Sequence, residues 1–167
     1  MLSLEAIYVG IGGTGGSIIK SQDRFFHNKR YLYLDKGADL QYGYDELAGI
    51  ERNIYNKQNL PSYFSNENRY ILFLGLGGKT GSYIITEILD YLHTNNIEHQ
   101  CYCFYPYHFE PKSRIFIADE ALVSLERYQN VTILNMDEMK KRFQNLSLAS
   151  PFWIPNDILI EEYIRVD

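Results

Sequence analysis

One stretch near the middle of the chain constrains the fold more than any other. Residues 70–74, Tyr-Ile-Leu-Phe-Leu, form an unbroken apolar run, which is typical of a strand buried on both faces of a parallel sheet. Residues 75–82, Gly-Leu-Gly-Gly-Lys-Thr-Gly-Ser, cannot continue that strand, because their four glycines favour turns and close approach to a ligand. Apolar residues at helical spacing over 83–92 then predict a helix. The stretch therefore predicts a strand, a glycine loop and a helix whose N-terminus favours an anion such as phosphate.

A second stretch of the same kind lies near the N-terminus. Residues 4–9 predict a strand, residues 10–17 are rich in glycine, and a helix is expected to begin at residues 18–20. Because the pattern of strand, glycine loop and helix occurs twice, a turn that merely packs a helix on a strand explains it poorly. We expect both loops to contribute to one ligand site.

An alternative use of the first loop stays open at the sequence level. Gly10, Gly12 and Gly15 match the G-x-G-x-x-G pattern of dinucleotide-binding folds, in which glycines permit close approach to a pyrophosphate. Asp35 follows a predicted strand at 31–34, at about the spacing of a ribose-binding carboxylate. An NAD- or FAD-binding Rossmann enzyme would explain these residues, although it gives no role to the second loop.

The rest of the chain continues the alternation of strands and helices. Further strands are predicted at 100–105 and 131–134, and helices at 44–54 and 115–128. This order indicates an α/β fold, with a doubly wound, mainly parallel sheet, helices on both faces and ligands at the carboxyl ends of the strands. With 167 residues, of which 46% are hydrophobic, we expect one domain over 1–167.

Composition and charge exclude several classes of function. A net charge of -5 gives no electrostatic reason to expect nucleic acid or an anionic membrane as a partner. The sequence has no signal-like N-terminus and no apolar run of membrane-spanning length, so we expect a cytoplasmic protein. Cys101 and Cys103 are expected on opposite faces of a strand, which argues against a mutual disulfide. No His/Cys spacing indicates zinc, and we expect no metal held by protein ligands alone.

Taken in order, the loops resemble those of the nucleotide-binding domain of the tubulin and FtsZ superfamily. Gly10-Ile-Gly-Gly-Thr-Gly-Gly16 is similar to its first phosphate loop, and Gly77-Gly-Lys-Thr-Gly-Ser82 resembles its signature G-G-G-T-G-[ST]. Residues 106–114, which begin Pro-Tyr-His-Phe-Glu and end in Arg, resemble the bacterial P-F-x-F-E-G-x-x-R loop. Ile133-Leu-Asn135 is similar to the I-x-N turn, and residues 150–159 resemble D-A-F-G-A-A-N-D-V-L.

The resemblance implies a guanine-nucleotide site for GTP or GDP, with Mg²⁺ arriving on the nucleotide. Backbone N–H groups of the two glycine loops would hold the phosphates, Glu110 and Arg114 would address the ribose side, and Asn135, Phe152 and Asp157 would address the base. The implied nucleotide-binding residues are Gly12, Gly13, Thr14, Gly15, Gly77, Gly78, Lys79, Thr80, Gly81, Ser82, Glu110, Arg114, Asn135, Phe152, Asn156 and Asp157.

The departures from the family pattern concern hydrolysis. Lys79 and Tyr83 replace signature glycines, and no counterpart of the γ-phosphate loop is visible between residues 35 and 70. The chain ends at Asp167, within what resembles the central helix of the family, and lacks the N-x-D-x-x-D loop that activates water. We therefore expect no catalytic residues, little or no GTP hydrolysis by the chain alone, and self-association or a protein partner. A nucleotide-free, FtsZ-like interaction module is the other open alternative.

Overall fold

In the part of the chain that the structure describes, six parallel strands form one sheet in the order β3-β2-β1-β4-β5-β6. The structure is a computed structural model that describes residues 4–21, 30–35 and 52–142. The strands are β1 (Glu5–Ile11), β2 (Arg30–Asp35), β3 (Arg52–Ile54), β4 (Asn68–Gly75), β5 (His99–Tyr105) and β6 (Val131–Asn135). The α/β fold with a parallel sheet, expected from the sequence, is confirmed.

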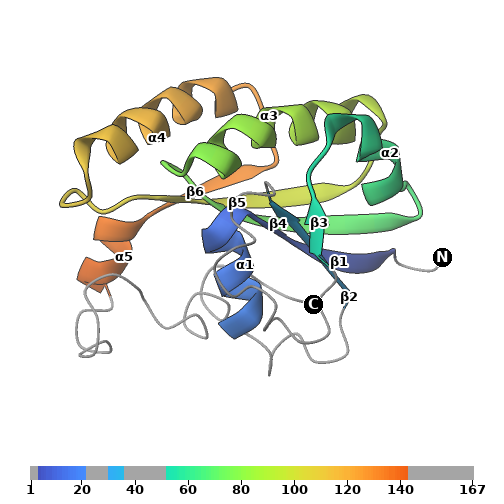
Figure 1. Ribbon diagram of the computed structural model, residues 1–167, viewed down its shortest axis with the longest axis horizontal. Helices are drawn as coiled ribbons and strands as arrows, with labels where there is room; N and C mark the ends of the chain where they lie inside the picture. The colour runs from blue at the N-terminus through green and yellow to red at the C-terminus, as the bar shows by residue number, and fades with distance from the viewer. Residues whose placement is uncertain (1–3, 22–29, 36–51, 143–167) are drawn as a thin grey trace.

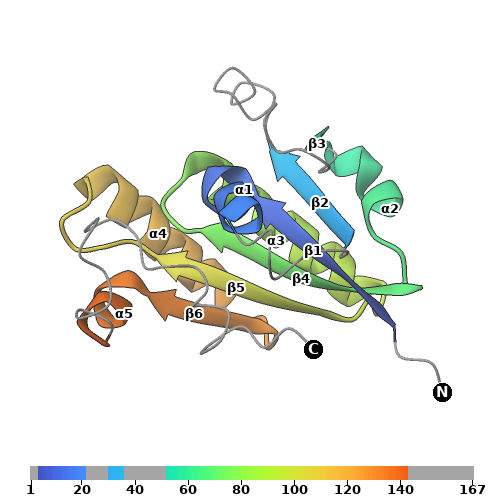
Figure 2. The same cartoon turned by 90° about the horizontal axis from the view of Figure 1, so that it is seen from below.

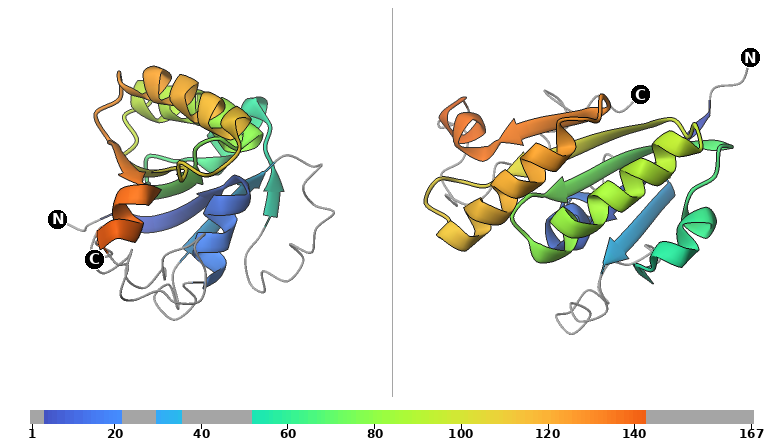
Figure 3. Two further views of the ribbon diagram at one scale, coloured as in Figure 1. Left: turned by 90° about the vertical axis from the view of Figure 1, so that its left-hand side faces the viewer. Right: turned by 90° about the horizontal axis from the view of Figure 1, so that it is seen from above.

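Helices cover both faces of this sheet. The helices α2, α3 and α4 lie on one face, and α1 lies on the opposite face (Figure 1, Figure 3). The helices are α1 (Gly12–Ser21), the 3-10 turn η3 (Lys57–Asn59), α2 (Leu60–Tyr63), α3 (Lys79–Thr94), α4 (Lys112–Leu125) and α5 (Met136–Arg142). Covering both faces explains why the central strands have apolar runs without polar alternation.

The centre of the core is formed by β1, β4 and the inner face of α3. Val9 of β1 pairs in register with Leu72 of β4, and both side chains are fully buried. Ile85, Ile88 and Leu92 of α3 are also fully buried, at the spacing of one helical face. The glycine loop that joins β4 to α3 is therefore held between two of the most deeply buried elements of the chain.

The strand order reverses direction between β1 and β4. From β1 the chain continues to β2 and β3 on one side of the sheet, and then returns to place β4 on the other side of β1 (Figure 2). In open parallel sheets the loops diverge at such a switch point, and ligands bind in the crevice at the carboxyl ends of the strands. Both glycine-rich loops, after β1 and after β4, lie at this place.

One predicted helix was wrong in the part that the structure describes. Residues 52–54, the end of the helix expected over 44–54, form the edge strand β3, which pairs in parallel with β2. Residues 44–51 lie outside the described residues. A strand of three residues is too short to show the alternation of polar and apolar residues that identifies strands in a sequence. Only its backbone pairing with β2 shows that residues 52–54 form a strand. The helix expected over 115–128 begins earlier, at Lys112 after Pro111, and ends at Leu125.

The expected placement of the two cysteines was also wrong. Side chains alternate along a strand, so residues two apart point to the same face. In β5 the thiols of Cys101 and Cys103 lie 3.7 Å apart, and both cysteines are buried and free. Burial, together with the contact to Cys103, raises the pKa of the Cys101 thiol, so it stays protonated in the core.

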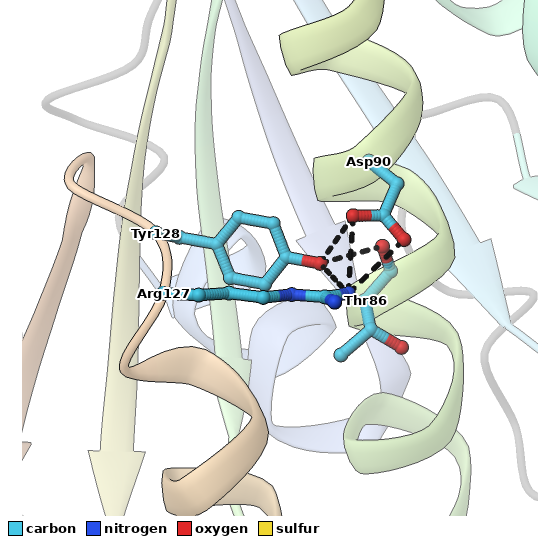
Figure 4. Close-up of polar contacts among 4 residues, drawn as sticks. All are labelled: Thr86, Asp90, Arg127 and Tyr128. Carbon is cyan, nitrogen blue, oxygen red and sulfur yellow. Dashed lines mark hydrogen bonds and ion pairs between the residues drawn. The ribbon is translucent and has the colours of Figure 1, made fainter.

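A polar cluster after α4 ties that helix to α3, which runs beside it (Figure 3). The Tyr128 hydroxyl lies within hydrogen-bond distance of Asp90 Oδ1 and of the Thr86 carbonyl, and Arg127 contacts both Asp90 oxygens at 3.2 Å (Figure 4). The Asp90 and Arg127 side chains are more than half exposed, so solvent screens their ion pair. The Tyr128 side chain is partly buried, so we expect its hydrogen bonds to stabilise the packing of α4 on α3 more than the exposed ion pair does.

We expect Tyr128→Phe to lower the free energy of unfolding by about 1 kcal/mol, since it removes the hydroxyl that joins α4 to Asp90. The matched change Arg127→Ala removes the ion pair with Asp90 and the contacts of the guanidinium group with the Tyr128 hydroxyl and ring. Because these contacts are exposed to solvent, we expect the change to cost less than Tyr128→Phe, about 0.5 kcal/mol. Urea unfolding followed by circular dichroism measures both. A larger loss for the Arg127 variant would contradict this ranking.

Candidate functional site

The first glycine loop brings the start of α1 against the start of α3. Gly12, which begins α1, has a φ of +71°, in the left-handed region that favours glycine. A Cβ at Gly12 would lie 3.7 Å from the backbone nitrogen of Gly81, in the first turn of α3. Two helix N-termini therefore meet at the switch point of the sheet, where their partial positive charges reinforce one another.

Two further glycines of the first loop serve packing. A Cβ on Gly15 would lie 2.2 Å from the carbonyl oxygen of Phe73, and a Cβ on Gly16 would lie 1.9 Å from the buried ring of Tyr33. Thr14 fills the space beside Gly75, where an added Cβ would lie 2.7 Å from its Oγ1. Gly15 therefore lets α1 approach the sheet closely. Gly13 belongs to the first turn of the same helix.

In the second loop, one residue opens onto free space. Among the described residues, no heavy atom lies within 4 Å of a Cβ built on Gly78, whose φ of -79° is accessible to any residue. Gly78 is also the N-cap of α3 and provides no side-chain cap. The first N–H groups of a helix lack acceptors within it, so the backbone from Gly78 through Lys79 and Thr80 offers donors to a ligand. The side chains of Lys79 and Thr80 lie outside the described residues.

Gly77 and Ser82 of the second loop contact other groups of the protein. The N–H of Gly77 donates a hydrogen bond to the buried Oγ of Ser82, 3.1 Å away. Gly77 has a φ of +97°, and a Cβ there would lie 2.7 Å from the carbonyl oxygen of Arg114. The Ser82 hydroxyl thus fixes the bend of the loop, and the start of α4 packs directly against it.

Glu110 and Arg114, expected on the ribose side, contact one another. The Glu110 carboxylate accepts a hydrogen bond of 2.6 Å from the Tyr107 N–H, and its other oxygen lies 3.1 Å from Arg114 Nε. Arg114 Nε is buried and the contact lacks hydrogen-bond alignment, so it is an ion pair. Because Arg114 also packs on Gly77, the ion pair connects the loop after β5 to the second glycine loop.

The base end of the predicted site is placed only in part. Asn135 ends β6, and its side-chain oxygen accepts a hydrogen bond of 3.2 Å from the N–H of Glu138 in α5. Asn135 therefore caps a helix at the carboxyl edge of the sheet, beside Tyr105 of β5. Phe152, Asn156 and Asp157 lie outside the described residues.

Asp35, on which a dinucleotide site would depend, is enclosed by the protein. It ends β2, is 1% exposed, and accepts a hydrogen bond of 2.7 Å from the Tyr33 hydroxyl. A carboxylate that binds ribose hydroxyls has to face the ligand. The burial of Asp35 therefore weighs against the NAD or FAD alternative.

A group of aromatic and charged residues beside the loop after β5 was not predicted as functional. The rings of Tyr107 and Phe109 are stacked with centroids 4.8 Å apart, and Lys140 Nζ lies 5.4 Å from the Phe109 centroid. His108 contacts Asp137 through both its backbone N–H and its ring. Tyr107 is buried, and its hydroxyl has no hydrogen-bond partner among the described residues. One feature of the sequence could have drawn attention to Tyr107: it stands where the P-F-x-F-E-G-x-x-R pattern has phenylalanine.

Two classes of site are absent from the ranges that the structure describes. Within residues 4–21, 30–35 and 52–142, no three His, Cys, Asp or Glu side chains come together as a metal site would require. None of the helices in those ranges is both long and apolar enough to cross a bilayer.

Comparison with known proteins places the fold. No protein-family model and no curated protein matches the sequence. Among solved structures, FtsZ from M. jannaschii matches with a TM-score of 0.72 and 16% identity, covering 96% of this chain and 53% of FtsZ. CetZ from Methanosaeta thermophila matches with a TM-score of 0.65 and 14% identity, covering 85% and 49%. A TubZ protofilament structure from bacteriophage PhiKZ matches with a TM-score of 0.57 and 11% identity, covering 95% and 57%.

The chain thus spans about half the length of these proteins, and at such low identity the likeness concerns the fold alone. The FtsZ and TubZ matches cover nearly all of this chain. They agree with the fold that the resemblance of its loops implied. In its fold the chain is a tubulin/FtsZ-like domain.

Proposed function

We propose that the chain binds a guanine nucleotide, GTP or GDP, at the carboxyl edge of the sheet between β1 and β4. The observation that carries this proposal is the open backbone at Gly78, at the start of a 16-residue helix and beside the start of α1. Aligned peptide dipoles and unpaired N–H groups favour an anion at such a place. A di- or triphosphate is the anion that also fits the glycine pattern of both loops.

In this proposal the phosphates contact the backbone of the first turns of α1 and α3. Gly12, Gly13, Gly78, Thr80 and Gly81 provide N–H groups, and Mg²⁺ arrives with the phosphates. Gly77 and Ser82 act by fixing the loop, because the Gly77 N–H and the Ser82 hydroxyl already bind one another. Glu110 and Arg114 lie beside the ribose, and the ion pair between them fixes the loop after β5.

For the base we propose the roles that the family resemblance implies. Asn135 and Phe152 contact the guanine ring, and Asp157, with Asn156 beside it, accepts hydrogen bonds from guanine N1–H and the exocyclic amine. Adenine lacks this pair of donors. A site built around such a pair strongly disfavours the analogue without it.

We also propose that the chain acts through self-association or a protein partner, with little hydrolysis alone. FtsZ and TubZ structures with this fold are described as a dimer and a protofilament. In-line attack on a phosphate needs a group that positions the water. In this proposal a second chain supplies that group.

The test begins with the nucleotide that co-purifies with the protein, identified by denaturing release and chromatography. Titration with fluorescent GTP, GDP and ATP at matched Mg²⁺ follows. We expect GTP or GDP to bind, and ATP to bind at least about a hundredfold more weakly. Equal binding of all three, or no binding, would overturn the proposal.

One observation favours a second candidate, a nucleotide-free interaction module. Several groups of the site already have partners within the protein, namely the Gly77 N–H, the Ser82 hydroxyl and the Glu110 carboxylate. A site that satisfies its own polar groups needs no ligand for its stability. Absence of released nucleotide, together with absence of binding in the titration, would favour this candidate.

A further inference from the structure

The Tyr107 hydroxyl is a buried polar group that makes no hydrogen bond in the part of the chain that the structure describes. Tyr107 is 2% exposed, lies in the loop directly after β5, and its hydroxyl has no hydrogen-bond partner among the described residues. A buried hydroxyl without a partner destabilises a protein, so nearly all buried hydroxyls have one. Phenylalanine would keep the ring without this cost, and the bacterial loop that residues 106–114 resemble has phenylalanine here. A ligand therefore accounts for the hydroxyl better than packing does.

The surroundings of Tyr107 leave its hydroxyl free to donate. Glu110 is engaged with the Tyr107 N–H and with Arg114, and Asp137 is engaged with His108. Burial first, and then the negative charges of Glu110 and Asp137, raise the pKa of Tyr107, so the group stays protonated at neutral pH. A bound ligand with an acceptor oxygen can take this hydrogen bond.

We propose that the Tyr107 hydroxyl donates a hydrogen bond to the ribose of the bound nucleotide, directly or through one water. The inference rests on the proposed function, in which Glu110 and Arg114 address the ribose. The Tyr107 N–H donates to the Glu110 carboxylate, so Tyr107 lies beside the residue that the proposed function places on the ribose side. The Tyr107 hydroxyl is buried, so direct contact requires the side chains that cover it to move. Phe109, which is 42% exposed, stacks on the Tyr107 ring.

The experiment compares wild type and Tyr107→Phe in binding GTP, 2′-deoxy-GTP and 3′-deoxy-GTP. We expect the substitution to weaken GTP binding about tenfold, the usual scale of one hydrogen bond. It should have little effect on the analogue that lacks the ribose hydroxyl concerned, because the contact is already absent there. The melting temperature of the unliganded variant should be at least that of wild type, since the hydroxyl makes no hydrogen bond to residues 4–21, 30–35 or 52–142.

Tyr105→Phe is the matched control. It removes a hydroxyl two residues away that donates to Asp119 at 2.6 Å, and we expect it to leave nucleotide affinity unchanged. Unchanged GTP affinity in Tyr107→Phe would overturn the inference while the proposed function stands. Equal weakening for all three nucleotides would overturn the assignment to the ribose. If wild type binds no nucleotide, both the inference and the proposed function fail.

Discussion

Gly78→Asp is expected to weaken nucleotide binding severely while leaving the fold intact. The side chain enters a space in which no described atom lies within 4 Å of the new Cβ, and the backbone at φ -79° accepts any residue. Aspartate is a better N-cap than glycine by only a few tenths of a kcal/mol, so stability should stay level or rise slightly. The same carboxylate occupies the position proposed for a phosphate and repels it. We expect affinity to fall at least about a hundredfold.

Gly78→Asn separates charge from volume in this experiment. Asparagine has nearly the size and the capping strength of aspartate, but it is neutral. We expect it to weaken binding about tenfold through its volume, and the remaining difference from aspartate to shrink at high salt. Isothermal titration at two salt concentrations, with thermal melts of both variants, measures this. Wild-type affinity in the aspartate variant would show that no phosphate binds at the start of α3.

The sequence alone was sufficient to predict the parallel sheet and the edge at which its two glycine loops meet. Residues 70–74 are apolar throughout because β4 is covered on both faces, and a strand with one face in solvent would show polar alternation instead. Glycines after two such runs indicated where the chain leaves the sheet. The three-residue strand β3 carries no comparable signal, since only its pairing with β2 defines it.

The roles of individual glycines could not be predicted from the pattern. In the sequence, Gly15 and Gly78 are both simply glycines of a glycine-rich loop. In the structure, Gly15 lies against the Phe73 carbonyl, whereas no described atom lies close to a Cβ on Gly78. The difference depends on where a third element, β4 or α3, passes, and that is tertiary information. Ser82 is a similar case, since its hydroxyl points back to the Gly77 N–H.

Gly15→Ala is expected to be the most destabilising single change in the first loop. Its Cβ would lie 2.2 Å from the Phe73 carbonyl oxygen and 3.1 Å from two backbone atoms of Gly10, so neither neighbour can yield by changing a side-chain rotamer. Gly15 lies within α1, and alanine gains about 1 kcal/mol of helix propensity there. Moving α1 off the sheet costs more, because it uncovers the fully buried centre of β1 and β4.

The net loss for Gly15→Ala should be about 3–5 kcal/mol, a large part of the stability of a small domain. Urea unfolding measures it, with Gly78→Asn as the control glycine substitution, which is expected to stay within about 0.5 kcal/mol of wild type. The two variants should also differ in how they affect nucleotide binding. Gly15→Ala should reduce binding only by reducing the fraction of folded protein. Saturating GTP should therefore raise the melting temperature of this variant part of the way back to that of wild type. A Gly15→Ala variant that melts with wild type would show that α1 does not lie as close to β4 as the structure places it.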